Sequence, residues 1–318
     1  MDYNLPFLAL SDSSVNSRYR SCRRKFEFNK LYGHKRAERE DSLPADAGSA
    51  LHRAWQAYMA EKSKARGIEE LLFSYPVHLQ KSSMQERSLE ACYTTFLEMV
   101  ANPLHGRYEL ATVKVGNEIK PAVEVPFRIN IANVSLSHDR MVPIYWDGFI
   151  DAIMWDTLEL RYVVVDLKTT RKNERDYTAM FGNDPQTLPY AYVVEKATGQ
   201  TAASGLDVIY LVAYVDHLFP RVQQLPLHKT EHDISSWAFG LAMDIQAIRH
   251  MADIGFFPKD GKSCVGYGAC QYLDVCSYTE PAAIREWLDL RYGPPDYETV
   301  LADFQPWFTI DLTITGLS

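Results

Sequence analysis

The sequence lacks any apolar run of about 18 residues, so no segment of the 318 residues predicts a membrane-spanning helix. It also lacks a basic amino-terminal segment followed by a long apolar stretch, so we expect no secretory signal and a cytoplasmic location. No Gly-x4-Gly-Lys-Ser/Thr motif is present, which excludes a P-loop motor within this sequence. Internal repeats, low-complexity tracts and Pro/Gly/Ser-rich linkers are absent as well.

Basic residues are not in excess. The net charge is -8, whereas proteins that bind DNA non-specifically usually present a basic surface. The value is a weak argument against nucleic acid, because a carboxylate cluster that binds a metal makes the bare chain more acidic than the loaded protein. Two local basic groups leave solvated surface and DNA contact both open. They are Arg18, Arg20, Arg23, Arg24 and Lys25, and Lys168, Arg171, Lys172 and Arg175.

Cysteine is scarce, and its five residues are unevenly placed. Cys22 lies near the start, whereas Cys264, Cys270 and Cys276 form a C-x5-C-x5-C group near the end. Thiols stay reduced in the cytosol, so an odd number indicates metal ligands plus one spare rather than disulfides. The spare is Cys92, which we expect to be a small buried apolar side chain. The other four can form one site only if the fold brings both ends of the chain together.

The spacing of these thiols bears on what they bind. Structural zinc favours C-x2–4-C pairs, and neither interval here is that short. A four-thiolate [4Fe–4S] cluster tolerates irregular spacing and is favoured over zinc, with plain buried thiols as the third interpretation. Gly261, Gly266 and Gly268 suit a loop that wraps closely around a cofactor.

Helical patterns precede a sheet, and further helices follow it. A cap-rich segment at 11–14 precedes an expected helix over 15–31, and a second helix carries His52, Trp55 and Met59. Two or three more helices are expected up to about Gly116, with breaks at 75–76 and 102–103. The later expected elements are strands at 123–131, 145–155, 160–168, 208–215 and 222–227, and helices at 186–198 and 234–253.

These elements predict one α/β domain over 1–318. Within it we expect a helical part at 1–120 with Cys22 and His52, and a sheet core at 121–230. Helices and the cysteine loop follow at 231–292. The tail at 293–318 either docks a partner or caps the core.

Charged residues end two neighbouring strands of the expected sheet. Asp166 and Lys168 point to the same face because side chains alternate along a strand, and Asp151 can approach Asp166 if the strands form a hairpin. Two such carboxylates favour a hard cation, Mg²⁺ or Mn²⁺, between them. A lone D-x-K triplet is usually an exposed ion pair. The buried run Val163-Val164-Val165 before it favours a site instead.

Several motifs together resemble the PD-(D/E)xK nuclease superfamily. Within it, the chain resembles the RecB-type branch with an iron–sulfur cluster, which includes AddB-type helicase–nucleases, CRISPR-adaptation nucleases and many phage exonucleases. Ile150 stands where many relatives have Pro, and the first cysteine interval is longer than their C-x2-C. The matching segments are Ser17 to Phe26, Gly48-Ser49-Ala50-Leu51-His52, Gly148-Phe149-Ile150-Asp151, Asp166-Leu167-Lys168 and Gln186-Thr187-Leu188-Pro189-Tyr190.

The resemblance implies a restriction-endonuclease-like core, a central mixed sheet flanked by helices, with a helical amino-terminal extension and a cluster-bearing carboxy-terminal one. It implies a metal-dependent deoxyribonuclease that acts as an exonuclease on single-stranded DNA or duplex ends, in a bacterial or phage-infected cell. It also implies a helicase or recombination protein as partner. The implied catalytic residues are Asp151, Asp166, Lys168, Gln186 and Tyr190. The implied Mg²⁺ or Mn²⁺ ligands are His52, Asp151, Asp166 and Leu167, and the implied cluster ligands are Cys22, Cys264, Cys270 and Cys276.

Two other functions stay open at this point. A non-catalytic DNA-binding or scaffolding relative would keep the fold without cleavage, but the intact set of His52, Asp151, Asp166 and Lys168 argues against it. An iron–sulfur redox protein would have no use for that set. Cleavage polarity, and exonuclease against endonuclease action, are not readable from the sequence.

Overall fold

The computed structural model describes residues 10–11, 19–34, 43–79, 87–101, 104–137, 140–170, 181, 184, 186–200, 206–216, 218–264, 270–294 and 308–311. Within them, no helix is long and apolar enough to cross a membrane. The chain divides into two compact units, which are described in turn. Unit 1 is Met1–Arg39, Arg128–Gly148 and Ser236–Ser318, and unit 2 is Glu40–Phe127 and Phe149–Ser235.

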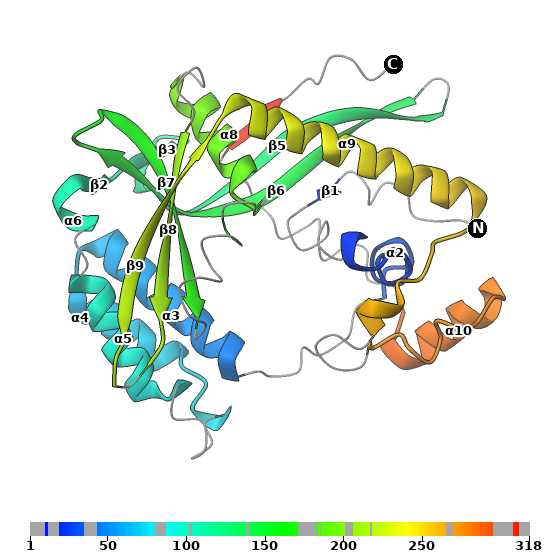
Figure 1. Ribbon diagram of the computed structural model, residues 1–318, viewed down its shortest axis with the longest axis horizontal. Helices are drawn as coiled ribbons and strands as arrows, with labels where there is room; N and C mark the ends of the chain where they lie inside the picture. Colours follow the sequence, from blue (N-terminus) through cyan, green and yellow to red (C-terminus); the bar gives the residue numbers. More distant parts are fainter. Residues whose placement is uncertain are drawn as a thin grey trace. The chain divides into compact units, whose positions relative to one another are not determined.

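Unit 2 contains most of the described helices (Figure 1). Ser63 caps α4 by accepting a hydrogen bond from the Arg66 amide, and Pro76 follows shortly after the helix ends, as the sequence predicts. The helices are α3 (Leu43–Glu61), α4 (Lys64–Ser74), the 3-10 turn η3 (Val77–Leu79), α5 (Leu89–Ala101), α6 (Leu104–Arg107) and α8 (Thr187–Thr198).

A mixed sheet forms the rest of unit 2. Its strands are β5 (Val123–Ser137) and β6 (Arg140–Asp156), each of which continues into unit 1, and β7 (Arg161–Thr170), β8 (Leu206–Tyr214) and β9 (Arg221–Lys229), in that spatial order. The β6–β7 and β8–β9 pairs are antiparallel, and the β7–β8 pair is parallel. A parallel pair needs a crossover, and α8 lies on this connection. The expected mixed α/β core is therefore confirmed.

Different helices pack on the two faces of this sheet. On one face, Leu167, Leu211 and other apolar strand residues join one core cluster with α3 and α5. The adjacent strand residues point the other way, and there Tyr210 contacts Thr187 of α8. Figure 1 shows α3, α4 and α5 beside β7, β8 and β9.

The expectation of helices up to about Gly116 is wrong for residues after 107. The short strand β2 (Tyr108–Leu110) pairs with β6, and β3 (Thr112–Val115) pairs with β4 (Glu118–Pro121) as a separate hairpin. Val113 and Val115 alternate with polar residues, which is the strand period. Gly116 has φ of +60° in the turn, a conformation that glycine adopts at little cost.

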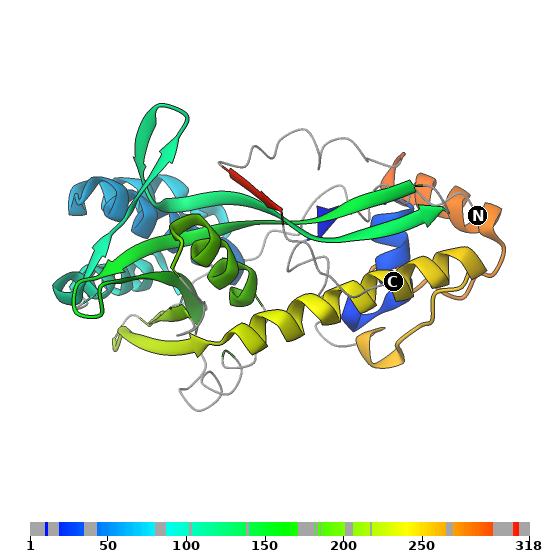
Figure 2. The same ribbon diagram turned by 90° about the horizontal axis from the view of Figure 1, so that it is seen from above.

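Unit 1 contains the described segments of both ends of the chain. The helix expected over 15–31 is interrupted at Cys22: residues 19–21 are helical, α2 (Arg23–Phe26) leads into a π-helical turn, η2 (Glu27–Leu31), and residues 15–18 lie outside the described residues. The other elements are β1 (Leu10–Ser11), η6 (Gly261–Cys264), α10 (Pro281–Tyr292) and β10 (Phe308–Asp311). The long helix α9 (Glu231–Ile254), straight in Figure 2, begins in unit 2 and continues here.

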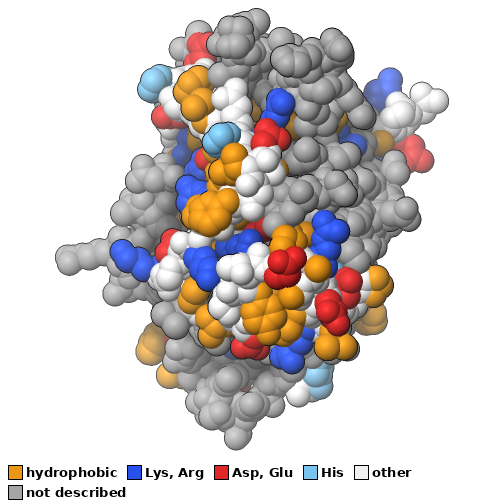
Figure 3. All heavy atoms as spheres, turned by 90° about the vertical axis from the view of Figure 1, so that its right-hand side faces the viewer, with side chains coloured by type: hydrophobic (Ala, Val, Ile, Leu, Met, Phe, Trp, Pro, Cys, Tyr) orange, Lys and Arg blue, Asp and Glu red, His pale blue; other side chains and the backbone are white. Residues whose placement is uncertain are grey.

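A second core cluster joins the two ends of the chain inside unit 1. Phe28 and Tyr32 pack with Tyr272, Val275 and the apolar face of α10. On the face shown in Figure 3, described Lys and Arg side chains are interspersed with acidic and hydrophobic ones. Arg24, one of the basic residues near the start of the chain, forms an ion pair of 2.6 Å with buried Glu27. It therefore belongs to the interior of unit 1.

Candidate active site

The β6–β7 hairpin brings Asp151 and Asp166 together. The antiparallel register runs to Ala152 opposite Val165, and the next residues on the two strands are the two aspartates. The Leu167 amide donates a hydrogen bond of 2.7 Å to Oδ2 of Asp151. Asp166 is only 1% exposed, so it is not half of an exposed ion pair at a strand end.

Lys168 connects this carboxylate pair to α8. Its ammonium lies 2.7 Å from Oδ2 of Asp166 and donates a hydrogen bond of 3.0 Å to Oε1 of Gln186. Gln186 in turn donates from Nε2 to the Tyr190 hydroxyl at 3.3 Å. The Tyr210 ring lies beneath the ammonium, with 5.8 Å from Nζ to the ring centroid. The structure therefore brings Asp166, Lys168, Gln186 and Tyr190 into one hydrogen-bonded group.

Asp184 supports the start of α8, and the sequence patterns did not single it out. Its Oδ1 accepts a hydrogen bond of 2.9 Å from the Gln186 amide, which fixes the residue that holds Lys168. Its charge also acts on Lys168 and on Lys229, a lysine that is only 4% exposed. An Asp three residues before the start of a helix is the one signal that could have identified it, as an Asx-type turn.

His52 reaches the site from α3. Gly48, one turn earlier, lies against β7 so closely that a Cβ there would meet Thr169 Oγ1 at 2.7 Å. This close approach brings His52 Nδ1 to 3.8 Å from Oδ2 of Asp151, and the imidazole also contacts the main chain of Leu167. The four residues predicted as metal ligands, His52, Asp151, Asp166 and Leu167, are therefore neighbours.

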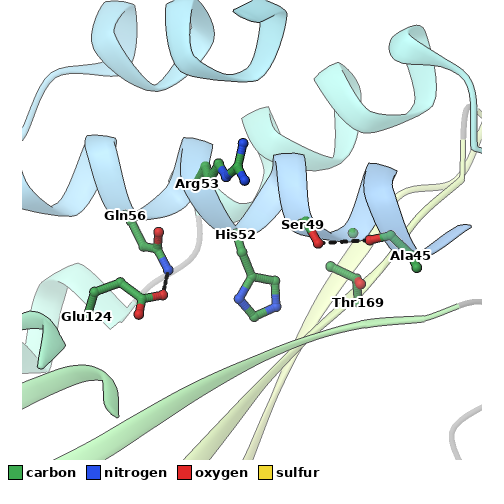
Figure 4. A pocket seen from close by; sticks show the side chains of 8 residues that line it. Ala45, Ser49, His52, Arg53, Gln56, Glu124 and Thr169 are labelled. Carbon is green, nitrogen blue, oxygen red and sulfur yellow. Dashed lines mark hydrogen bonds between the residues drawn. The ribbon is translucent and has the colours of Figure 1, made fainter. Parts of the chain in front are cut away.

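A cavity of about 810 Å³ opens beside His52. Figure 4 shows His52 and Gln56 reaching into it from α3, with Glu124 hydrogen-bonded to Gln56 across it. Glu124 has φ of +48°, an uncommon and strained conformation for a residue with a Cβ. The sequence shows only a polar residue in the expected strand over 123–131, so Glu124 could not be distinguished from a solvated position.

Burial dominates the electrostatics of the carboxylates. It raises the pKa values of Asp151 and Asp166 above the ordinary range of aspartate. Burial and the nearby Asp151 raise the pKa of Glu124 to about 7. Burial alone would lower the pKa of Lys168, but Asp166, Asp151 and Asp184 together raise it, so Lys168 remains an ammonium. Burial lowers the pKa of His52 to about 4, so its ring is neutral at physiological pH.

Comparison with known families gives one match over most of the chain. The model of the PD-(D/E)XK nuclease superfamily matches residues 9–277. The chain belongs to this superfamily. The segments that carried the resemblance lie within the matched residues, including the hairpin with Asp151 and Asp166 and the Lys168 that follows.

Individual relatives are more distant. No curated protein matches the sequence significantly. Among solved structures, a protein described as "Putative exonuclease" from Eubacterium rectale is 15% identical with a TM-score of 0.46, and the match covers 89% of this chain and 94% of that one. The protein SSO0001 is 14% identical with a TM-score of 0.24, covering 63% of this chain and 74% of that one. At these values neither similarity assigns an activity to this superfamily member.

Enzymes of the PD-(D/E)XK superfamily use divalent metals such as Mg²⁺, and the donor set here suits such an ion. Asp151 and Asp166 offer carboxylate oxygens, the neutral His52 offers a ring nitrogen, and Leu167 can contribute only its main-chain carbonyl. Within the described residues, no three His, Cys, Asp or Glu side chains are arranged to hold a metal ion together. The fit therefore rests on the chemistry of these donors and on their burial.

Cys22, Cys264, Cys270 and Cys276 lie in unit 1. The fold brings Cys22 to the loop of the other three: Ser263 donates a hydrogen bond of 2.6 Å to the Ser21 carbonyl, and Cys270 N donates to the Cys264 carbonyl at 2.9 Å. Burial raises the pKa of the Cys276 thiol, and the Cys22 and Cys264 thiols are close enough to raise it further. Gly266 and Gly268 lie outside the described residues.

Cys92 lies apart from these four, in the α5 core of unit 2. It is fully buried, and burial raises the pKa of its thiol to about 12. A neutral, inaccessible thiol behaves as a small apolar side chain, as the sequence predicts.

Proposed function

We propose that this protein is a divalent-metal-dependent deoxyribonuclease, acting as an exonuclease on single-stranded or end-processed DNA in recombination, repair or phage DNA metabolism. The observation that carries the proposal is the convergence of Asp151, Asp166 and Lys168 at the end of one hairpin, next to His52. In the reaction a water oxygen attacks the phosphorus, and the bond from phosphorus to the leaving sugar oxygen breaks.

The residues of the site divide this work. His52, Asp151, Asp166 and the Leu167 carbonyl would hold the divalent cation, which polarises the scissile phosphate and lowers the pKa of a bound water. Lys168 places a fixed positive charge where negative charge develops on the phosphate, and it orients the attacking water. Gln186 keeps the ammonium in place through its 3.0 Å hydrogen bond, and Tyr190 holds the Gln186 amide.

The test is digestion of an end-labelled single strand with Mg²⁺ or Mn²⁺ by the wild type and by Asp166→Ala and Lys168→Ala variants. We expect both variants to lose cleavage while keeping the wild-type circular dichroism spectrum. Lys114→Ala is the matched control, because this exposed lysine lies on the β3–β4 hairpin. Cleavage by Asp166→Ala at the wild-type rate would refute the site, and a wild type that binds DNA without cutting it would favour the scaffolding alternative.

We also propose that Cys22, Cys264, Cys270 and Cys276 bind a [4Fe–4S] cluster. Such a cluster would assign the protein to the RecB-type branch of the superfamily. The hydrogen bond from Ser263 to Ser21, beside Cys264 and Cys22, supports it, as does the rise that the Cys22 and Cys264 thiols cause in the pKa of Cys276. Hydrolysis needs no electrons, so the cluster would act as a crosslink between the two ends of unit 1. Four thiolates are also the ligand set that such clusters take.

Anaerobic purification and a visible spectrum test the cluster. We expect absorbance near ~400 nm from thiolate-to-iron charge transfer, lost in Cys22→Ser and Cys276→Ser and retained in Cys92→Ser. Iron and sulfide analysis distinguishes the cluster from zinc. Zinc alone, no metal, or a full cluster in Cys22→Ser would each overturn this part and leave the nuclease proposal untouched.

A further inference from the structure

The face of the sheet that bears the catalytic lysine continues across two more strands. Side chains at paired positions of neighbouring strands point to the same face. The register therefore extends this face from β7 through β8 to the edge strand β9. The three rows are Asp166, Tyr210 and Leu225; Lys168, Val212 and Gln223; and Thr170, Tyr214 and Arg221.

The last row ends in an arginine that is held in place. The Arg221 guanidinium lies over the Tyr214 ring, with 4.0 Å from Cζ to the ring centroid, and Arg221 is exposed to solvent. The Tyr214 hydroxyl donates a hydrogen bond of 2.8 Å to Oε1 of Gln223. Stacking restricts the rotamers of Arg221, so an anion that it binds costs less ordering entropy.

Arg221 lies a short distance from Lys168 along the sheet. It is two strands from Lys168, ~10 Å across the sheet, and two residues further along, ~7 Å. Both side chains therefore lie on one face of the sheet, within the length of a few nucleotides.

An exposed aromatic residue precedes Arg221. Phe219, in the β8–β9 turn, is 80% exposed. Asp216 fixes the turn, because its Oδ1 accepts hydrogen bonds from the Leu218 and Phe219 amides at 2.8 and 3.1 Å. A solvent-facing phenyl ring two residues before an exposed arginine offers the two kinds of side chain with which proteins hold unpaired bases and their phosphates.

We propose that Arg221 and Phe219 form a contact site for a single DNA strand outside the metal site, with Arg221 on a phosphate and Phe219 stacked on an unpaired base. The site rests on the proposed nuclease function and specifies its substrate, because bases inside a duplex are stacked on both faces and leave no face for Phe219. Tyr214 and Gln223 act as positioning residues that hold the guanidinium.

Binding of fluorescently labelled oligothymidylate, measured by anisotropy with Ca²⁺ in place of Mg²⁺, tests the site. We expect Arg221→Gln to weaken binding about 10-fold, as for loss of one charged hydrogen bond. The slope of log K against log salt should become shallower by about 0.7, the value for one phosphate of a single strand. In cleavage assays, KM should rise more than kcat falls. Phe219→Ala should weaken binding with an unchanged salt slope.

Lys196→Gln is the matched control, because Lys196 also lies over a tyrosine ring, that of Tyr192, at the far end of α8. Unchanged affinity and salt slope in Arg221→Gln, with wild type that binds and cuts, would overturn this site alone. Equal weakening of blunt duplex binding would overturn the single-strand assignment. A wild type that neither binds nor cuts DNA would instead refute the proposed function. Arg221→Lys should keep the salt slope, which separates lost charge from a folding defect.

Discussion

The Leu167 amide donates its hydrogen bond of 2.7 Å to Asp151, a side chain of the neighbouring strand. Ala152 and Val165 are the last residues that pair across the β6–β7 hairpin, and Asp151 is the next residue on β6. The main chain of β7 thus fixes the orientation of Asp151, and Asp166 and Lys168 flank the same amide in sequence. Residues 166–168 of β7 therefore supply two of the site's side chains, Asp166 and Lys168, and orient a third, Asp151.

We expect His52→Ala to raise the Mn²⁺ concentration needed for half-maximal cleavage roughly 10-fold, because one ligand is replaced by water. The pKa of His52 is lowered to about 4, so its protonation should not limit metal binding above pH 5, about one unit higher. A metal titration of DNA cleavage measures this. His78→Ala is the control, because His78 is exposed on η3. An unchanged titration would make His52 a packing residue.

Gly48→Ala should lower activity by pushing α3 away from β7 and moving His52. The added Cβ would lie 2.7 Å from Thr169 Oγ1, which is closer than carbon and oxygen pack. Thr169→Ala removes that oxygen, and the next atom, Thr169 Cβ, is 3.9 Å away. The double variant should therefore recover most of the cleavage rate that Gly48→Ala loses.

Gly106→Ala is the control for the glycine change, since nothing lies within 4 Å of a Cβ at this helical position. Helix propensity alone predicts that replacing a helical glycine by alanine stabilises by up to about 1 kcal/mol. Activity, rather than stability, is thus the informative measurement. If Thr169→Ala fails to rescue Gly48→Ala, the close approach is not what the glycine provides.

Asp184→Ala should reduce kcat roughly 10- to 100-fold, because Gln186 and then Lys168 lose their fixed positions. Asp184→Asn keeps an oxygen that can accept from the Gln186 amide, so it should retain more activity than the alanine variant. Metal and DNA affinities should change little in both. Equal losses in both variants would show that the charge of Asp184, rather than its hydrogen bond, matters.

Asp156→Asn should destabilise unit 2 at pH 7, because it removes the carboxylate that accepts the hydrogen bonds of the partly exposed Arg107. Asp156 is 1% exposed, and Arg107 donates to it from Nε and from Nη2, the latter at 2.6 Å. These hydrogen bonds lower the pKa of Asp156 in the folded state. The stabilisation is therefore complete above the unfolded pKa of ~3.9 and is lost as pH falls through the lowered folded value.

Denaturant unfolding of wild type and Asp156→Asn, followed from neutral pH to below pH ~3, measures the effect. The difference between the two proteins should shrink in acid. A difference that stays constant down to the lowest pH would mean that the ionised carboxylate contributes nothing beyond its shape.

The catalytic strands could be predicted because their signals are local. Hydrophobic alternation and the buried run at Val163 to Val165 predict β5, β6 and β7 to within a few residues of their true bounds, apart from the far ends of β5 and β6. The hairpin that brings Asp151 toward Asp166 follows from two strands and a short turn. The breaks at Tyr75-Pro76 and the helix α8 were predictable for the same reason.

Residues whose role depends on tertiary contacts were not predictable. Glu124 and Asp184 carry no motif, and only the folded chain brings Glu124 to Gln56 and Asp184 to the Gln186 amide. The β3–β4 hairpin was missed because four-residue strands are too short for a clear period. The strand β5 extends beyond the expected bounds because the alternation changes phase after Ile131, with Val134 and Leu136 apolar. The start of β6 was missed because Met141-Val142-Pro143-Ile144 does not alternate.

The parallel pairing of β7 with β8 has a consequence for how the enzyme is made. The β6–β7 hairpin closes over a short turn and can form as soon as residue 170 has been synthesised, whereas β8 must wait for the crossover through α8. Both aspartates are then in place before Tyr210 and α8 dock beside Lys168. A nascent chain that ends before β8 holds the two acidic residues without the packing of Tyr210 against Lys168, so the proposed activity requires the crossover and β8.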